Sequence, residues 1–149
     1  MNELLLTLLD EAYEKKSWHG PNLRGSLRGV DADTAAWRPS PQAHNIWELA
    51  LHAAYWKYVV WRKVTGARRG SFALTGSNFF PRPAEPGETA WKHDLAILDS
   101  AHRDLRASVA KMKPGAPEKL LHAIRGAAAH DLYHAGQIRL LRRLCELKK

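Results

Sequence analysis

Cysteine is almost absent from this sequence, since Cys145 is the only one among 149 residues. A lone thiol cannot form a disulfide within the chain, and it cannot build a zinc site from several thiolates. Any metal ion bound by this chain must therefore be held mainly through nitrogen and oxygen atoms.

Long hydrophobic runs are also missing, because no apolar stretch approaches the ~20 residues that a membrane-spanning helix requires. The first segment has Glu3 ahead of a short leucine-rich stretch, without the basic start and small-residue cleavage site of a secretory signal. The composition, with 45% hydrophobic and 26% charged residues, is typical of globular proteins. We therefore expect a single domain over residues 1–149, located in the cytoplasm, because this length suits one hydrophobic core.

Positive charge is in excess, with a formal net charge of +8. A basic surface attracts nucleic-acid phosphates without any sequence-specific contact. Much of this excess, however, falls where helices are expected to end, and cations there stabilise the helix dipole. We therefore do not expect nucleic acid as a partner. The cations at these predicted helix ends are Arg62, Lys63, Arg68, Arg69, Arg139, Arg142, Arg143, Lys148 and Lys149.

Apolar residues recur at helical spacing in four long segments, and no segment has the alternation of a β-strand. Prolines separate these segments, because proline interrupts a helix interior. Asn45 and Glu48 have the spacing of a capping box, so the second long helix should begin at Ile46. We predict an all-α fold, a four-helix bundle. The long helices are predicted over residues 3–16, 46–66, 88–112 and 118–147, with a short helical piece over residues 21–28.

Residues 66–87 join the second and third long helices and show no helical period. The segment is rich in glycine and proline, which predicts a long irregular loop. Loops of this length inside compact domains are usually functional lids or partly disordered.

Three histidines lie on the apolar stripes of two predicted helices. His130 and His134 are one turn apart on the fourth long helix, and His52 is one turn from Leu49 and Trp56 on the second. A buried imidazole must satisfy two nitrogens, and an apolar core offers few partners. A shared divalent cation would satisfy all three rings; the alternative is ordinary hydrogen-bonded core histidines. We predict a site for zinc, nickel or iron with coordination positions left open.

Other polar residues are candidates for supporting roles around this site. His102 is on the seam of the third helix and is a possible fourth ligand, supporting group or proton carrier. Glu48 either orients His52 or only caps its helix. Asp131 and Gln137 flank the histidine pair and either support it or are solvated. The remaining histidines, expected at the surface, are His19, His44, His93 and His122.

Several motifs together resemble the DinB-like superfamily of metal-binding four-helix bundles. The resemblance implies metal ligands at His52, His130 and His134, and it implies a homodimer. One segment departs from the pattern of the relatives, which tend to have a tryptophan before the proline at Asn78-Phe79-Phe80-Pro81. The motifs that carry the resemblance are Trp18-His19-Gly20-Pro21, Trp37-Arg38-Pro39, His44-Asn45-Ile46-Trp47-Glu48-Leu49 and residues 130–138.

Some members of this superfamily are thiol-dependent transferases, such as the bacillithiol and mycothiol enzymes. The resemblance therefore implies a metal-dependent S-transferase or detoxification enzyme, with a low-molecular-weight thiol and a small electrophile as substrates. The alternatives are a metal-dependent hydrolase using Asp131, Glu48 or His102 as general base, and a non-catalytic metal-stabilised binding or dimerisation protein. DNA binding, suggested only by the charge and the family name, is a further alternative.

Overall fold

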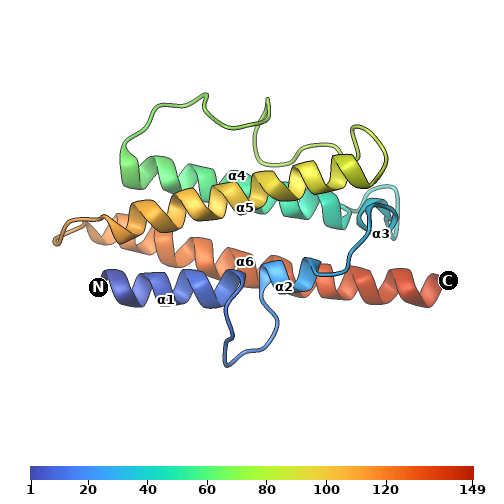
Figure 1. The fold of residues 1–149 in the computed structure, drawn as a ribbon, viewed down its shortest axis with the longest axis horizontal. Helices are drawn as coiled ribbons and strands as arrows, with labels where there is room; N and C mark the ends of the chain where they lie inside the picture. The colour runs from blue at the N-terminus through green and yellow to red at the C-terminus, as the bar shows by residue number, and fades with distance from the viewer.

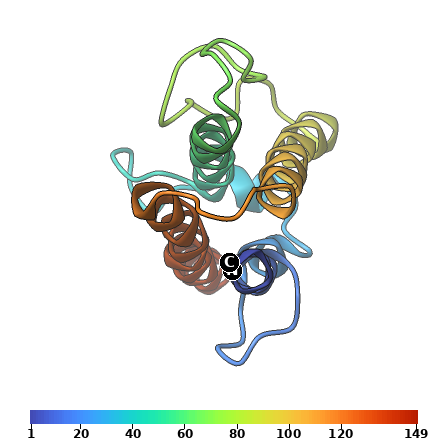
Figure 2. The same ribbon diagram turned by 90° about the vertical axis from the view of Figure 1, so that its left-hand side faces the viewer.

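The structure, a computed structural model, describes all 149 residues, and its only regular elements are six helices. Four long helices lie along one another, each at one corner of the bundle seen end-on (Figure 2). The short α2 continues the side of α1 along α6 (Figure 1). The predicted all-α bundle is confirmed. The helices are α1 (Asn2–Tyr13), α2 (Leu23–Leu27), α3 (Ala32–Ala36), α4 (Ile46–Thr65), α5 (Glu88–Ala110) and α6 (Glu118–Lys148).

The ends of α4 follow from local sequence. Asn45 Oδ1 accepts a hydrogen bond from Glu48 N at 2.8 Å, and Glu48 Oε1 accepts one from Asn45 N at 3.4 Å, which completes the predicted capping box. The helix ends at Gly66, whose φ of 75° is a left-handed conformation that glycine adopts without a steric penalty.

A polar layer divides the core into two apolar clusters. On α4, Lys57 separates Ala54 of one cluster from Val60 of the other, and on α5 His102 stands between Leu98 and Leu105. Asp131 of α6 completes this layer by forming an ion pair with Lys57, in which both side chains are only 1% exposed. Each charge of this ion pair stabilises the other, because an isolated buried charge is strongly unfavourable.

Two details of the sequence interpretation were wrong. No helix was predicted over Ala32–Ala36, yet α3 forms one turn there, capped by Asp31, whose Oδ1 accepts a hydrogen bond from Thr34 N at 2.8 Å. A single turn is too short to show a helical period. Trp56, one turn from His52 on the predicted apolar stripe, is 39% exposed, and its indole Nε1 donates to Asn78 Oδ1 at 2.9 Å.

The predicted loop over residues 66–87 folds back over α4 and α5 (Figure 1). Phe80 is buried in the core at 4% exposure. Arg82 fixes the end of the loop, since its backbone N donates to Glu48 Oε2 at 2.9 Å and its Nε donates to Asp94 Oδ2 at 2.8 Å. This loop, called the lid below, carries Asn78 and Phe79 onto α4.

None of the helices is both long enough and apolar enough to cross a membrane.

The buried ion pair gives a prediction about stability. Lys57→Met leaves the Asp131 carboxylate without its partner, so we expect the free energy of unfolding to fall by about 3–5 kcal/mol at pH above 7. The matched control is Arg125→Met, which removes an exposed ion pair with Glu118 and should cost at most about 1 kcal/mol. Urea unfolding of the two variants measures the difference, and equal small losses would contradict the role given to the buried pair.

Candidate metal centre

The three predicted histidines meet at one point between α4 and α6. His130 Nε2 lies 3.1 Å from His52 Nε2 and 2.9 Å from His134 Nε2. One ring nitrogen from each histidine lies within 4.8 Å of the others, an arrangement that could hold a metal ion. Histidine residues 78 positions apart in the sequence, His52 and His130, are thus brought together as expected.

The outer nitrogens of two of these rings fix the direction of their lone pairs. His52 Nδ1 lies 3.0 Å from the carbonyl oxygen of Asn78, and His134 Nδ1 lies 2.6 Å from Gln137 Oε1. A carbonyl oxygen only accepts hydrogen bonds, so both Nδ1 atoms carry the hydrogen and both Nε2 atoms carry a lone pair. Such support of the outer nitrogen is usual for histidines that bind metals.

These two lone pairs converge on His130 Nε2. If His130 Nε2 carries a hydrogen, it donates to one of the two neighbours well and leaves the other lone pair facing a nitrogen. A cation shared by the three nitrogens would accept all three lone pairs at once. The donor set therefore fits a transition-metal ion better than it fits a hydrogen-bonded histidine cluster.

The nitrogen separations agree with this interpretation. Two nitrogens each about 2.1 Å from one ion are about 3.0 Å apart at a right angle and about 3.4 Å apart at the tetrahedral angle. The separations of 3.1 and 2.9 Å have the size expected for neighbouring ligands of a single ion.

Burial keeps the three imidazoles neutral. His52 and His134 are 7% and 4% exposed, and His130 is half-buried. Burial, with a smaller contribution from the neighbouring imidazoles, lowers the pKa of His130 to about 3. Burial also lowers the pKa of His134 to about 4, and it lowers the pKa of His52. Neutral imidazole is the form that binds a metal ion, so the site is prepared for one at neutral pH.

Phe79 of the lid holds the His52 ring from one face. Its ring is 4.0 Å from the His52 ring at an interplanar angle of 7°, and 3.7 Å from the His44 ring at 2°. The three rings form a parallel stack with Phe79 in the middle. Asn78 and Phe79 together fix the orientation of His52, which sequence reasoning missed because the lid has no period that would reveal its contacts.

The supporting residues are placed partly as predicted. Gln137 contacts His134, as expected. Asp131, however, does not support the histidines but pairs with Lys57 in the core, so neither the supporting nor the solvated interpretation was right. Glu48 caps α4 and receives two hydrogen bonds from Arg38, at 2.6 and 2.8 Å, without contacting His52.

His102 is not part of the histidine cluster. Its Nδ1 lies 3.3 Å from Lys57 Nζ, and its ring stacks on Tyr13 at 3.8 Å. Burial, together with the charge of Lys57, lowers the pKa of His102 to about 2. Lys57 was missed by the sequence interpretation, although a charged residue one turn after Ala53 on an apolar stripe was the available signal.

A cavity of about 390 Å³ opens beside His134. Its walls are mainly apolar, and no carboxylate group lines it. Of the three clustered histidines, His134 lines this cavity. The lining residues are Ala43, His44, Leu49, Phe79, Tyr133, His134, Gln137, Leu140 and Leu141.

Comparison with known proteins gives one match. A sequence model described as the DinB superfamily matches residues 17–138, a range that contains all three clustered histidines. No curated protein and no solved structure matches the chain significantly.

The lowered histidine pKa values predict a pH dependence of stability. Histidine in the unfolded chain has a pKa of about 6.5, so between this pH and the folded-state values the unfolded chain binds more protons. The contribution of these histidines to the free energy of unfolding of the metal-free protein should therefore decrease as the pH falls from about 7.5 to about 5. Urea unfolding at the two pH values measures the decrease.

The contribution of the cluster is isolated by comparing two variants. His130→Asn should make this decrease smaller, because one of the groups that resists protonation is removed. His122→Asn, an exposed position on the same helix, should leave it unchanged. The same pH dependence in His130→Asn and in the wild-type protein would contradict the prediction.

Proposed function

Because the chain belongs to the DinB superfamily and brings three imidazole nitrogens together, we propose that it binds one divalent transition-metal ion through His52, His130 and His134. The observation that carries this proposal is the convergence of lone pairs set by Asn78 and Gln137. Zinc, nickel and iron all accept neutral nitrogen ligands, so the proposal covers this group of metals.

We further propose that the protein is a metal-dependent S-transferase acting on a low-molecular-weight thiol and a small electrophile. A divalent ion at this site would lower the pKa of a thiol, so that the thiolate is available at neutral pH. Three protein ligands would leave a coordination position of the ion open for the thiol, as in catalytic rather than structural metal sites. The resemblance to thiol-dependent members of the superfamily supports this reaction.

The residues of the chain have separate tasks in this proposal. Asn78 and Gln137 keep the ligand lone pairs directed inward. Leu49, Phe79 and Leu140 form an apolar wall that binds an uncharged electrophile. An apolar wall therefore favours a substrate with a hydrophobic group.

Hydrolysis is less well supported. The three groups considered as a general base each have another partner: Asp131 pairs with Lys57, Glu48 with Arg38, and His102 with Lys57. None of the three lines the cavity beside His134. A thiol, which is much more acidic than water, needs less assistance to ionise.

Metal content tests the first part of the proposal. Protein purified without chelator should contain about one divalent ion per chain by elemental analysis. His130→Ala should lose most of this metal, and His122→Ala, exposed on the same helix, should retain it. Metal at blank level in the wild-type protein, even after incubation with zinc or nickel, would contradict the proposed site.

Activity tests the second part. We expect the metal-loaded protein to consume 1-chloro-2,4-dinitrobenzene or monobromobimane faster when cysteine, coenzyme A or bacillithiol is supplied. Leu140→Gln, in the cavity wall, should raise the KM for the electrophile about tenfold, equivalent to about 1.4 kcal/mol of lost apolar contact. Leu144→Gln lies one turn further along α6, does not line the cavity, and should leave the KM unchanged. Thiol-independent ester or amide cleavage would instead favour a hydrolase.

A further inference from the structure

Glu48 is a fixed carboxylate close to the candidate metal centre. It is 5% exposed, and it accepts hydrogen bonds from both Arg38 Nη atoms and from the backbone N of Arg82 at 2.9 Å. Burial alone would raise the pKa of Glu48, but the hydrogen bonds from Arg38, Arg82 and His44 lower it to about 2. Glu48 is therefore ionised near neutral pH.

His44 stands in front of this carboxylate. Its Nδ1 lies 3.2 Å from Glu48 Oε1, four residues further along the chain. An ionised carboxylate only accepts hydrogen bonds, so His44 donates through Nδ1–H and its Nε2 carries a free lone pair. A carboxylate behind one imidazole nitrogen makes the other nitrogen a better proton acceptor and stabilises the imidazolium that forms.

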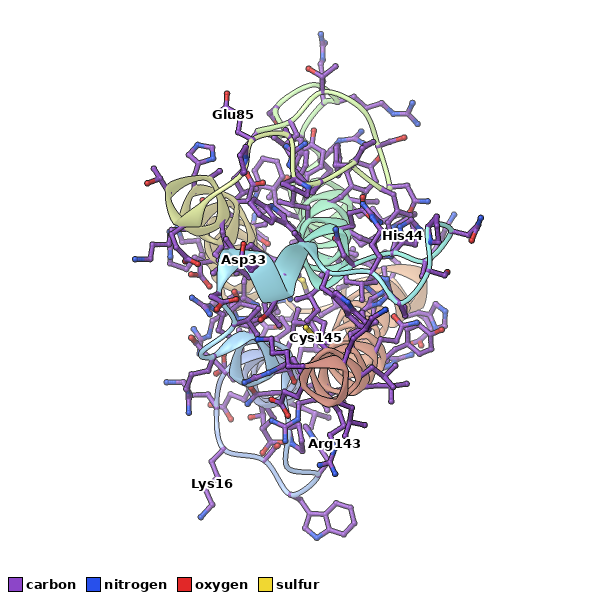
Figure 3. All side chains as sticks on the ribbon, turned by 90° about the vertical axis from the view of Figure 1, so that its right-hand side faces the viewer. Lys16, Asp33, His44, Glu85, Arg143 and Cys145 are labelled. Atoms are coloured by element: carbon purple, nitrogen blue, oxygen red, sulfur yellow. The ribbon has the colours of Figure 1, made fainter.

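His44 lies at the wall of the cavity beside His134. Phe79 stacks on the His44 ring at 3.7 Å, and the other face of Phe79 stacks on the metal-ligand candidate His52. His44 and His134 line the same cavity of about 390 Å³. Figure 3 shows His44 on the segment that leads into α4, on the side of the molecule where α6 lies. Half of its side chain, 48%, is exposed, which leaves it accessible to a ligand.

We propose that His44 is the proton acceptor for the thiol that enters this cavity. The inference rests on the proposed thiol-dependent function. The S–H bond breaks, the electron pair stays on sulfur, and the proton moves to His44 Nε2, which becomes an imidazolium next to Glu48. Among the residues that line the cavity, His44 is the only titratable base outside the histidine cluster apart from the phenol of Tyr133.

His44 then acts as a catalytic residue, and Glu48 and Arg38 are positioning residues behind it. The imidazolium keeps the proton close to the reacting sulfur, where it can be returned to a leaving group or to an opened ring on the electrophile.

Proton counting by calorimetry tests the inference without depending on turnover. The zinc-loaded full-length protein is titrated with 2-mercaptoethanol at about pH 8 in buffers of different ionisation enthalpy, which gives the number of protons released to the buffer for each thiol bound. Zinc-bound water contributes equally in both proteins, so the difference between them is the measure. Because His44 takes up the proton in the wild-type protein, we expect His44→Gln to release more protons for each thiol bound, by up to about one.

His93→Gln is the matched control. His93 is also an exposed histidine next to a carboxylate, with its Nδ1 3.3 Å from Asp94 Oδ1, but it does not line this cavity. This variant should release protons as the wild-type protein does. Zinc content measured on all three proteins checks that the site is intact, which is expected because His44 is outside the ligand cluster.

The outcomes separate the two proposals. Equal proton release by the wild-type protein and His44→Gln, with thiol bound by both, overturns the role of His44 and leaves the thiol-dependent function standing. Failure of the zinc-loaded wild-type protein to bind the thiol overturns the proposed function and this inference with it. A change in proton release in His93→Gln as large as that in His44→Gln also overturns the inference, because the change would then not depend on a residue of the cavity.

Discussion

The direction of two imidazole lone pairs, those of His52 and His134, is the constraint on which the site depends. Asn78 and Gln137 form hydrogen bonds with Nδ1 of His52 and His134, respectively. The Nε2 atoms of both rings therefore face His130. Lone pairs facing each other in a mostly buried place repel unless a cation or a proton lies between them. Because burial lowers the pKa of these histidines, a proton is a poor solution near neutral pH, and a metal ion is a good one.

The polar layer in the core fixes the helices that carry these ligands. Lys57 follows His52 by five residues on α4, and Asp131 follows His130 directly on α6. Their buried ion pair therefore joins α4 to α6 within about one and a half turns of the ligands. An apolar contact at this level would tolerate sliding of one helix along the other, whereas an ion pair at 1% exposure permits only a narrow range of positions. The pair thus helps to hold the register in which His52 meets the other two histidines.

The parts of this structure that sequence reasoning predicted are those in which one residue constrains its neighbours along the chain. Helical spacing placed His52, His130 and His134 on inward faces, and the capping box fixed the start of α4. The features that sequence reasoning missed depend on how two segments distant in the sequence pack against each other. The pairing of Lys57 with Asp131 requires the rotation of α4 relative to α6, and the stack of Phe79 on His52 requires the path of a lid without period. Both are set by tertiary contacts that no local pattern encodes.

Arg82 connects the lid, the start of α4 and the carboxylate behind His44. Its backbone carbonyl accepts hydrogen bonds from Arg38 Nη2 and Asn45 Nδ2, both at 2.9 Å, while its backbone N donates to Glu48 at 2.9 Å. Its side chain is held by Asp94, so the residue is anchored at both ends. Because Phe79 lies only three residues earlier, the same anchor limits where the lid can place that ring. The orientation of His52 on one face of Phe79, and of His44 on the other, is therefore set by one network of hydrogen bonds, which links the ligand geometry to the proposed proton acceptor.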